Sequence, residues 1–237
     1  MKIETSATVA ISNEAMALRK KGIEVYDFSA GDLILQNHPL IIEAIKNLKP
    51  FSPYSPVPGL PELREEAALR YNAKPSEIII TPGGKFALFA TLAALLNAGD
   101  KVIIEKPYWP SYPSIIGLAQ GTPLYVDSFN APLPKAKALI LNNPNNPTGK
   151  VYDKSEIDPL LKWADDNDAF IISDEVYSHL IFTDRPYYST PREGRTITIQ
   201  SLSKNYAMAG FRVGFIIAPE SIVKEILPII GQTVTTT

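Results

Sequence analysis

The feature that most constrains the fold is a regular alternation of short apolar runs and helical segments that begins at residue 77. Such alternation predicts a mainly parallel sheet with helices on both faces, because strands buried on both sides read as continuous apolar runs. The predicted fold class is therefore α/β, a three-layer α/β/α arrangement. The expected strands are 77–81, 101–105, 123–127, 138–142, 169–173, 196–200 and 213–218, and the expected helices are 85–97, 111–119, 155–167 and 221–227.

The first 76 residues read differently. A helix is expected over 12–21, with Ser12 as its N-cap and Gly22 as its stop. Two further helices, 39–48 and 61–71, begin with proline in the first turn, where the missing N–H costs nothing. The segment 50–61 is a proline-rich loop.

Composition narrows the possible chemistry. The chain has 237 residues, a net charge of −2 and 45% hydrophobic residues, which is typical of one globular domain or two small ones. Nucleic acid is therefore not an expected partner, and no apolar run is long enough to cross a bilayer. Met1 to Ser12 contains no apolar core of signal-peptide length, so we expect a cytoplasmic protein.

No cysteine is present, which excludes disulfides, thiol nucleophiles and thiolate metal sites. The two histidines, His38 and His179, are far apart in the sequence and disfavour a histidine metal cage or a serine-histidine triad. We expect no metal. Lysine, carboxylate and tyrosine chemistry remains.

A lysine with hydroxyls before it and a cation after it follows the expected strand 196–200. Lys204 ends the run Ser201-Leu202-Ser203-Lys204, and Arg212 follows eight residues later. Lysine amines form Schiff bases with aldehydes, so this pattern suits an aldehyde cofactor that carries a phosphate, namely pyridoxal phosphate. A lone lysine is usually a solvated surface residue, so the hypothesis depends on its surroundings.

Other candidate residues also follow expected strands, where ligands of such sheets bind. Gly83 and Gly84 precede a helix whose free N–H groups suit a phosphate, although a Gly-Gly pair is more often an ordinary turn. Trp109 can stack on a planar ring or pack in a core, whereas Trp163 favours the core.

An asparagine-rich loop and an acidic strand end complete the set. The loop 142–149 has turn residues at nearly every position, and its amides suit a phenolate oxygen and a carboxylate. Asp174 directly follows the strand 169–173, and Tyr177 would lie one turn further on if a helix begins there. The carboxylate of Asp174 can cap a helix, or it can keep a pyridine nitrogen protonated and so make the ring an electron sink.

Together these segments resemble the class I and II aminotransferases, which are fold type I pyridoxal phosphate enzymes, and particularly the prokaryotic aspartate aminotransferases. The resemblance covers nearly the whole chain. Its specific elements, in family order and similar spacing, are 81–88, 107–110, 145–149, 174–177 and 201–214.

The resemblance implies a role for each site residue. Lys204 would form the Schiff base and shuttle protons, and Asp174 would pair with the ring nitrogen. Asn146 and Tyr177 would hydrogen-bond the phenolic oxygen, with Asn146 and Gly31 near the substrate carboxylate. Trp109 would stack on the ring. The phosphate would be held by the backbone amides of Gly84 and Lys85 and by the side chains of Ser201 and Arg212. Tyr54 would reach the phosphate of a partner subunit in a homodimer.

The resemblance also implies a domain division: 1–40 as an N-terminal arm with a small-domain segment, and 41–237 as the cofactor-binding large domain. Three features depart from the family pattern. Asp32-Leu33 replaces an acidic-proline-aspartate run, the segment 127–138 is too short for a helix, and the family's C-terminal small domain, with its carboxylate-binding arginine, is not in this sequence.

The expected function is amino-group transfer between an amino acid, aspartate-like or broader in range, and a 2-oxo acid. The alternatives are a pyridoxal phosphate lyase of the same family and a truncated, non-catalytic cofactor-binding module. Formation of keto acid with the aminated cofactor left behind distinguishes the transferase from both, and ammonia release indicates the lyase.

Overall fold

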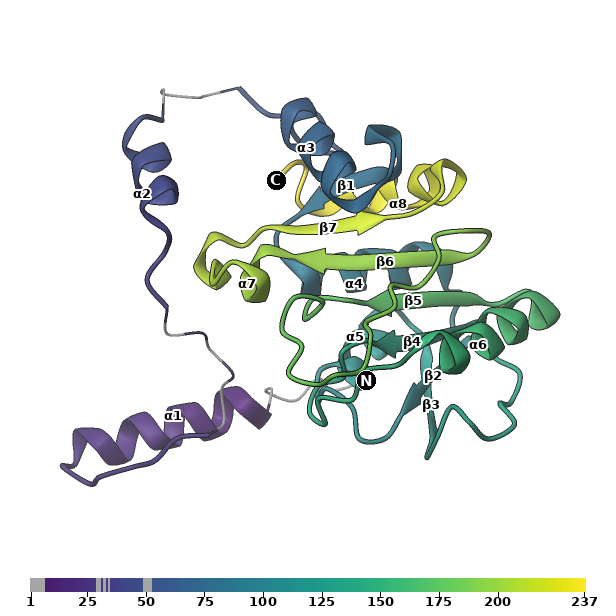
Figure 1. Cartoon of the computed structure of the whole chain (residues 1–237), viewed down its shortest axis with the longest axis horizontal. Coiled ribbons are helices and arrows are strands. Elements are labelled where there is room, and N and C mark those ends of the chain that lie inside the picture. The colour runs from purple at the N-terminus through teal and green to yellow at the C-terminus, as the bar shows by residue number, and fades with distance from the viewer. Residues whose placement is uncertain (1–6, 29–30, 32, 34, 49–52) are drawn as a thin grey trace.

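The computed structural model describes residues 7–28, 31, 33, 35–48 and 53–237. Within them the chain forms a seven-stranded sheet with the strand order β1-β7-β6-β5-β4-β2-β3 (Figure 1). This confirms the predicted α/β class. The strands are β1 (Ile78–Thr81), β2 (Lys101–Glu105), β3 (Thr122–Val126), β4 (Ala138–Asn142), β5 (Phe170–Asp174), β6 (Thr196–Ser201) and β7 (Gly214–Ile217).

The sheet is parallel except at β7. This strand pairs antiparallel with β6 and with β1, as in the partners Ser201 and Gly214 or Thr81 and Gly214. Only 202–213 separate β6 from β7, and they hold the four-residue helix α7 (Leu202–Asn205) and the 3-10 turn η2 (Ala209–Phe211). A parallel return usually runs through a longer helix that crosses the sheet, and the four-residue α7 is too short for that, so β7 runs back beside β6.

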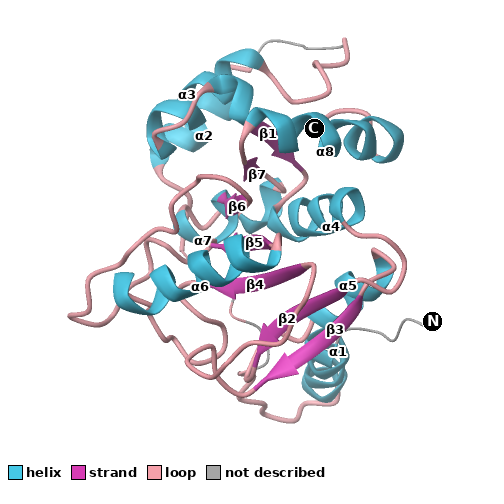
Figure 2. Cartoon of the chain, turned by 90° about the vertical axis from the view of Figure 1, so that its right-hand side faces the viewer, coloured by secondary structure: helices cyan, strands magenta, loops and turns pink. Residues whose placement is uncertain are grey.

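Three helices cover one face of the sheet: α4 (Gly84–Leu95), α5 (Tyr112–Leu118) and α8 (Glu220–Thr233) (Figure 2). Alternate strand residues, among them Ile104, Ile172 and Ile199, pack against them in the largest apolar cluster. Because side chains alternate along a strand, Asp174 lies on the same face as Ile172 and belongs to this side of the sheet.

The opposite face is covered by α3 (Pro61–Tyr71) and α6 (Lys154–Asn167), over two smaller apolar clusters. Helix α6 begins with a capping box, in which Asp153 accepts from the N–H groups of Ser155 and Glu156 while Glu156 accepts from the N–H of Asp153. Trp163 packs against the α6 cluster, as expected. A 3-10 turn, η1 (Pro75–Glu77), leads from α3 into β1.

The N-terminal helices stand apart from this body (Figure 1). Helix α1 spans Ala7–Lys20, so the prediction that Ser12 caps its start is wrong: Ser12 lies inside the helix. The early start follows from Ala7, Val9 and Ala10, which continue the helix before Ser12. Helix α2 (Pro39–Lys46) buries none of its residues, and its exposed apolar side chains include Leu40 and Ile45. None of the described helices is long and apolar enough to span a membrane.

Candidate active site

The centre of the candidate site is the buried carboxylate of Asp174, the last residue of β5. Its side chain is only 6% exposed, and no basic nitrogen lies within ion-pair distance of it among the residues that the structure describes. Burial raises the pKa of Asp174 from 3.8 to about 6. An unpaired charge in such a place is costly unless a ligand supplies the counterpart.

Tyr112 is a site residue that sequence reasoning missed. It is the first residue of α5, 2% exposed, and its hydroxyl donates a 2.7 Å hydrogen bond to Oδ2 of Asp174. This bond lowers the pKa of Asp174, against the larger effect of burial. The tyrosine ring also meets the Trp109 ring edge to face, with 5.4 Å between centroids. The available signal was a tyrosine three residues after Trp109, at the start of a helix that follows a strand.

The asparagine-rich loop is held against the end of β5. Asn142 donates its amide to the carbonyl oxygen of Asp174 at 2.9 Å and accepts from the backbone N–H of Asn146 at 2.7 Å. Asn146 in turn donates to the hydroxyl of Tyr177 at 3.1 Å. Tyr177 lies in a turn rather than in a helix, because Ser178 N–H bonds back to the carbonyl of Glu175. The predicted pair Asn146 and Tyr177 is therefore brought together beside Asp174.

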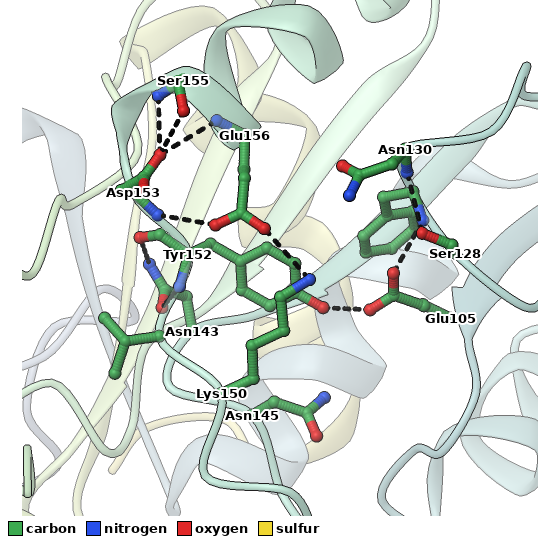
Figure 3. Close-up of polar contacts among 12 residues, drawn as sticks. Glu105, Ser128, Asn130, Asn143, Asn145, Lys150, Tyr152, Asp153, Ser155 and Glu156 are labelled. Carbon is green, nitrogen blue, oxygen red and sulfur yellow. Dashed lines mark hydrogen bonds and ion pairs between the residues drawn. The ribbon is translucent and has the colours of Figure 1, made fainter. Parts of the chain in front are cut away.

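Hydrogen bonds between Asn143 and the backbone of Tyr152 also hold this loop in place (Figure 3). The amide of Asn143 binds the backbone of Tyr152 in both directions, accepting its N–H at 3.0 Å and donating to its carbonyl at 3.3 Å. The hydroxyl of Tyr152 points toward Glu105 at the end of β2, and the other oxygen of Glu105 accepts from Phe129 N–H at 2.7 Å. These bonds tie the loop to strand β2 and to the start of α6.

The turn between β1 and α4, which the sequence predicted to bind the phosphate, is closely packed. Gly83, at φ +87°, caps α4 without a side chain, so the first N–H groups of α4 have no side-chain acceptor. A Cβ on Gly84 would lie 3.2 Å from Val176, and one on Gly83 only 2.4 Å from Nη2 of Arg212. The backbone amides and the guanidinium therefore lie together, a combination that suits an anion.

Lys204 lies in α7, whose N-cap is Ser201: the hydroxyl of Ser201 accepts from Ser203 N–H at 3.0 Å. Ser201 thus has a structural role, and its Cβ also lies within 3.5 Å of where a Cβ of Gly84 would stand. The ammonium of Lys204 donates to the carbonyl of Gly31 at 2.6 Å. The backbone beyond it is strained, since both Ala207 and Arg212 adopt positive φ, a pattern that concentrates at functional sites.

Trp109 is half-buried between two partners. Besides Tyr112, the ammonium of Lys85 lies 4.8 Å from its ring centroid. Burial lowers the pKa of Lys85, and the nearby Arg212 lowers it further. Lys85 therefore brings a side-chain cation to the site, in addition to the backbone amide that the sequence predicted.

Tyr54 is the one predicted residue that this chain does not bring to the cluster. It is described, and its side chain is 85% exposed. Gly31 contacts the cluster through Lys204, whereas Asp32 next to it lies outside the described residues.

A cavity of about 420 Å³ lies on the opposite face of the sheet. Its wall includes Glu175, which is 1% exposed and accepts from Tyr187, Ser189 and Thr190, and its rim includes Arg192, which caps the last carbonyls of α3. Glu175 and Asp174 are consecutive but serve different faces.

Comparison with known proteins agrees with this geometry. Residues 23–237 match the profile of the family described as aminotransferase class I and II. The chain belongs to this family, whose members use pyridoxal phosphate.

Named relatives are similar in sequence and structure. The aspartate/prephenate aminotransferase of Thermus thermophilus is 33% identical, with 98% of this chain and 66% of the relative covered. The solved aspartate aminotransferase of Thermus thermophilus with maleate superposes with a TM-score of 0.89 at 33% identity, covering 99% of this chain and 67% of that one. The aspartate aminotransferase of Thermotoga maritima gives a TM-score of 0.88 at 35% identity, covering 99% and 69%. The chain thus spans about two thirds of the length of these relatives.

Proposed function

We propose that this chain binds pyridoxal phosphate through the amine of Lys204 and moves an amino group between an amino acid and a 2-oxo acid. The observation that carries this proposal is the buried, unpaired carboxylate of Asp174. A protonated pyridine nitrogen supplies the missing donor and positive charge, and bound cofactor then acts as an electron sink.

The chemistry of the other residues fits the same group. Arg212 and the amides of Gly84 and Lys85 offer donors and positive charge to a phosphate. The pair Asn146 and Tyr177 offers donors to a phenolic oxygen. Ser201 takes part through its position beside Gly84, and Trp109 supplies a flat aromatic surface for the ring.

Lys204 has two tasks in this proposal. Its amine holds the cofactor aldehyde before substrate arrives, and once released it carries a proton to and from the substrate carbon. The carbonyl of Gly31 accepts a hydrogen bond from the ammonium of Lys204, which supports a substrate position between Gly31 and Asn146. Asp174 keeps the ring nitrogen protonated, while Tyr177 and Asn146 hold the opposite side of the ring.

The substrate class follows from the relatives' names. Relatives of this chain include aspartate/prephenate aminotransferases and aspartate aminotransferases. An asparagine-oxo-acid transaminase of Streptococcus mutans is 32% identical, with 98% of this chain covered. One related structure was solved with maleate, an acid with two carboxylates. We infer an aspartate-like amino donor.

The whole-protein organisation is part of the proposal. We infer a cytoplasmic homodimer in which Tyr54, exposed on this chain, reaches the phosphate of the partner subunit. A twofold dimer makes each such contact twice. The division into an N-terminal segment, 1–40, and a large domain, 41–237, is proposed with it.

The test is a single-turnover reaction. Chain loaded with pyridoxal phosphate is mixed with excess aspartate, and the absorbance of the aldehyde and amine forms of the cofactor is followed together with oxaloacetate and ammonia. A transferase converts the cofactor to its amine form and yields one oxaloacetate per site. Ammonia release with the aldehyde form retained identifies a lyase, and cofactor binding without either product identifies a binding module.

A further inference from the structure

Tyr112 donates a hydrogen bond to the carboxylate of Asp174, and the proposed reaction gives this tyrosine no role of its own. We propose that Tyr112 is a positioning residue, which orients Asp174 and Trp109 so that the cofactor ring is held between a fixed carboxylate oxygen and a fixed indole. The inference rests on the proposed function and assigns to this chain a residue that determines how well the ring is held.

The two oxygens of Asp174 have unequal surroundings. Oδ2 accepts the 2.7 Å bond from Tyr112, whereas Oδ1 receives, from the residues that the structure describes, only a long 3.5 Å contact from the N–H of Val176. A carboxylate has about four acceptor positions, so Oδ1 keeps capacity for another donor. The bond to Tyr112 therefore selects which oxygen is left for a ligand.

The backbone of Asp174 is already fixed by other groups. Its carbonyl accepts from the side chain of Asn142 at 2.9 Å and from the N–H of Asn143 at 3.0 Å. What remains free is rotation of the carboxylate about its own side-chain bonds. Tyr112 restrains that rotation, because its ring is buried and its hydroxyl is bonded to Oδ2.

The same ring supports Trp109. The two rings meet edge to face, at 88° and 5.4 Å between centroids, which is a favoured aromatic arrangement. Behind Tyr112, Ile115 and Ile116 of α5 are buried in the main apolar cluster. One rigid helix thus sets both the carboxylate and the indole.

Few titratable groups face Asp174. Tyr112 comes from α5, Tyr177 from the turn that follows β5, and Glu175 is the next residue along the chain, with its side chain on the other face. Burial raises the pKa of Asp174, and the hydroxyl of Tyr112 opposes that rise. Removing the hydroxyl therefore raises the pKa further and leaves less ionised Asp174 near neutral pH.

The chain offers a matched control for this experiment. The hydroxyl of Tyr187 donates a 2.7 Å bond to Glu175, the same length and the same kind of buried acceptor, on the opposite face of the sheet. Tyr112→Phe and Tyr187→Phe each remove one such bond, but only the first touches the proposed cofactor site.

The measurement is the dissociation constant of pyridoxal phosphate between about pH 5 and 9, followed by the quenching of protein fluorescence. We expect Tyr112→Phe to bind roughly tenfold more weakly near pH 7, with the acidic midpoint of binding moved upward. Tyr187→Phe should keep the dissociation constant within about twofold and leave the midpoint unchanged. A second variant carries 3-fluorotyrosine at position 112, which keeps the hydroxyl, makes it a stronger donor and should move the midpoint downward.

The outcomes separate the two proposals. If the unaltered chain does not bind pyridoxal phosphate, the proposed function fails and the positioning role fails with it. If the unaltered chain binds, the positioning role alone is overturned by equal binding and equal midpoints in Tyr112→Phe, or by equal shifts in Tyr187→Phe. Should Tyr112→Phe not fold, as judged by circular dichroism, the fluorotyrosine variant decides: an unchanged midpoint overturns the inference.

Discussion

At the scale of single residues, Asp174 combines burial with a missing counter-charge, and this has a consequence in the absence of cofactor. Its pKa rises from 3.8 to about 6 on folding. The folded chain therefore holds a proton that the unfolded chain has released between about pH 4 and 6. The stabilising contribution is complete below the unfolded pKa and is lost as pH rises through the folded pKa.

We predict that Asp174 lowers the free energy of unfolding by about 3 kcal/mol as pH rises through this window, because ionised Asp174 is poorly solvated in the fold. Asp174→Asn should lack this loss and should be more stable than the unaltered chain above about pH 7. Urea unfolding from pH 4 to 8 measures it. Asp153→Ala is a control: hydrogen bonding to Ser155 lowers the pKa of Asp153, so the stability lost in this variant should stay constant from pH 4 to 8. Parallel pH profiles for Asp174→Asn and the unaltered chain would contradict the prediction.

Most site residues could be predicted from the sequence because each follows an apolar strand at a turn. Lys204, Asp174 and Asn146 are of this kind, and their side-chain chemistry together with the family resemblance suggested their roles. Tyr112 could not be predicted in the same way, since its partner is 62 residues away. Their contact depends on β4 lying between β2 and β5, which brings the helix after β2 over the end of β5.

At the scale of elements, the proposed phosphate-binding turn between β1 and α4 depends on the close approach of β7. A Cβ on Gly214 would stand 2.5 Å from the backbone carbon of Gly83 and 2.6 Å from the nitrogen of Gly84. Backbone atoms cannot move aside as the end of a long side chain can. The glycine at the start of β7 is therefore needed for the turn that presents the α4 amides.

We predict that Gly214→Ala destabilises the fold by roughly 1–3 kcal/mol and weakens phosphate binding, because the β1–α4 turn must shift. Gly231→Ala, inside α8, is the matched control: its Cβ would meet Val57 at an ordinary 3.7 Å, so the helix should gain about 0.5–1 kcal/mol. Thermal unfolding and titration with pyridoxal phosphate measure both. A Gly214→Ala protein as stable as the unaltered chain would show that the close approach is not real.

The elements themselves were predicted unevenly. The bounds of α3, β2 and β4 agree with the sequence patterns to the residue, since prolines, glycines and β-branched runs mark them. The antiparallel direction of β7 and the short helix α7 were not predicted. Strand direction here depends on whether the connection contains a helix long enough to cross the sheet, and a four-residue helix leaves no periodic pattern to detect.

At the scale of the whole molecule, α2 exposes an apolar surface. Leu40 is 67% exposed and Leu48, just beyond the helix, is 73% exposed, with Ile42 and Ile45 between them also exposed. Burying such side chains contributes about 1.5–3 kcal/mol each. This exposed surface supports the homodimer of the proposed function, and we further propose that α2 packs against the partner subunit.

We predict that the chain sediments as a dimer and that Ile45→Glu shifts it toward monomer, because a charge then replaces an apolar side chain that the dimer would bury. Glu43→Gln, on the same helix, should leave the dimer intact. Sedimentation velocity at micromolar concentrations decides between the states. Either a monomeric unaltered chain or an Ile45→Glu protein that remains dimeric would count against the role of α2.

Borohydride reduction of the loaded chain tests whether Lys204 anchors pyridoxal phosphate. The chain is saturated with pyridoxal phosphate, reduced with borohydride and digested, and the modified peptide is identified by mass spectrometry, with Lys204→Ala as the control. We predict one cofactor per chain on Lys204 and none in Lys204→Ala. Modification of Lys85 in place of Lys204, or equal labelling of the Lys204→Ala protein, would contradict it.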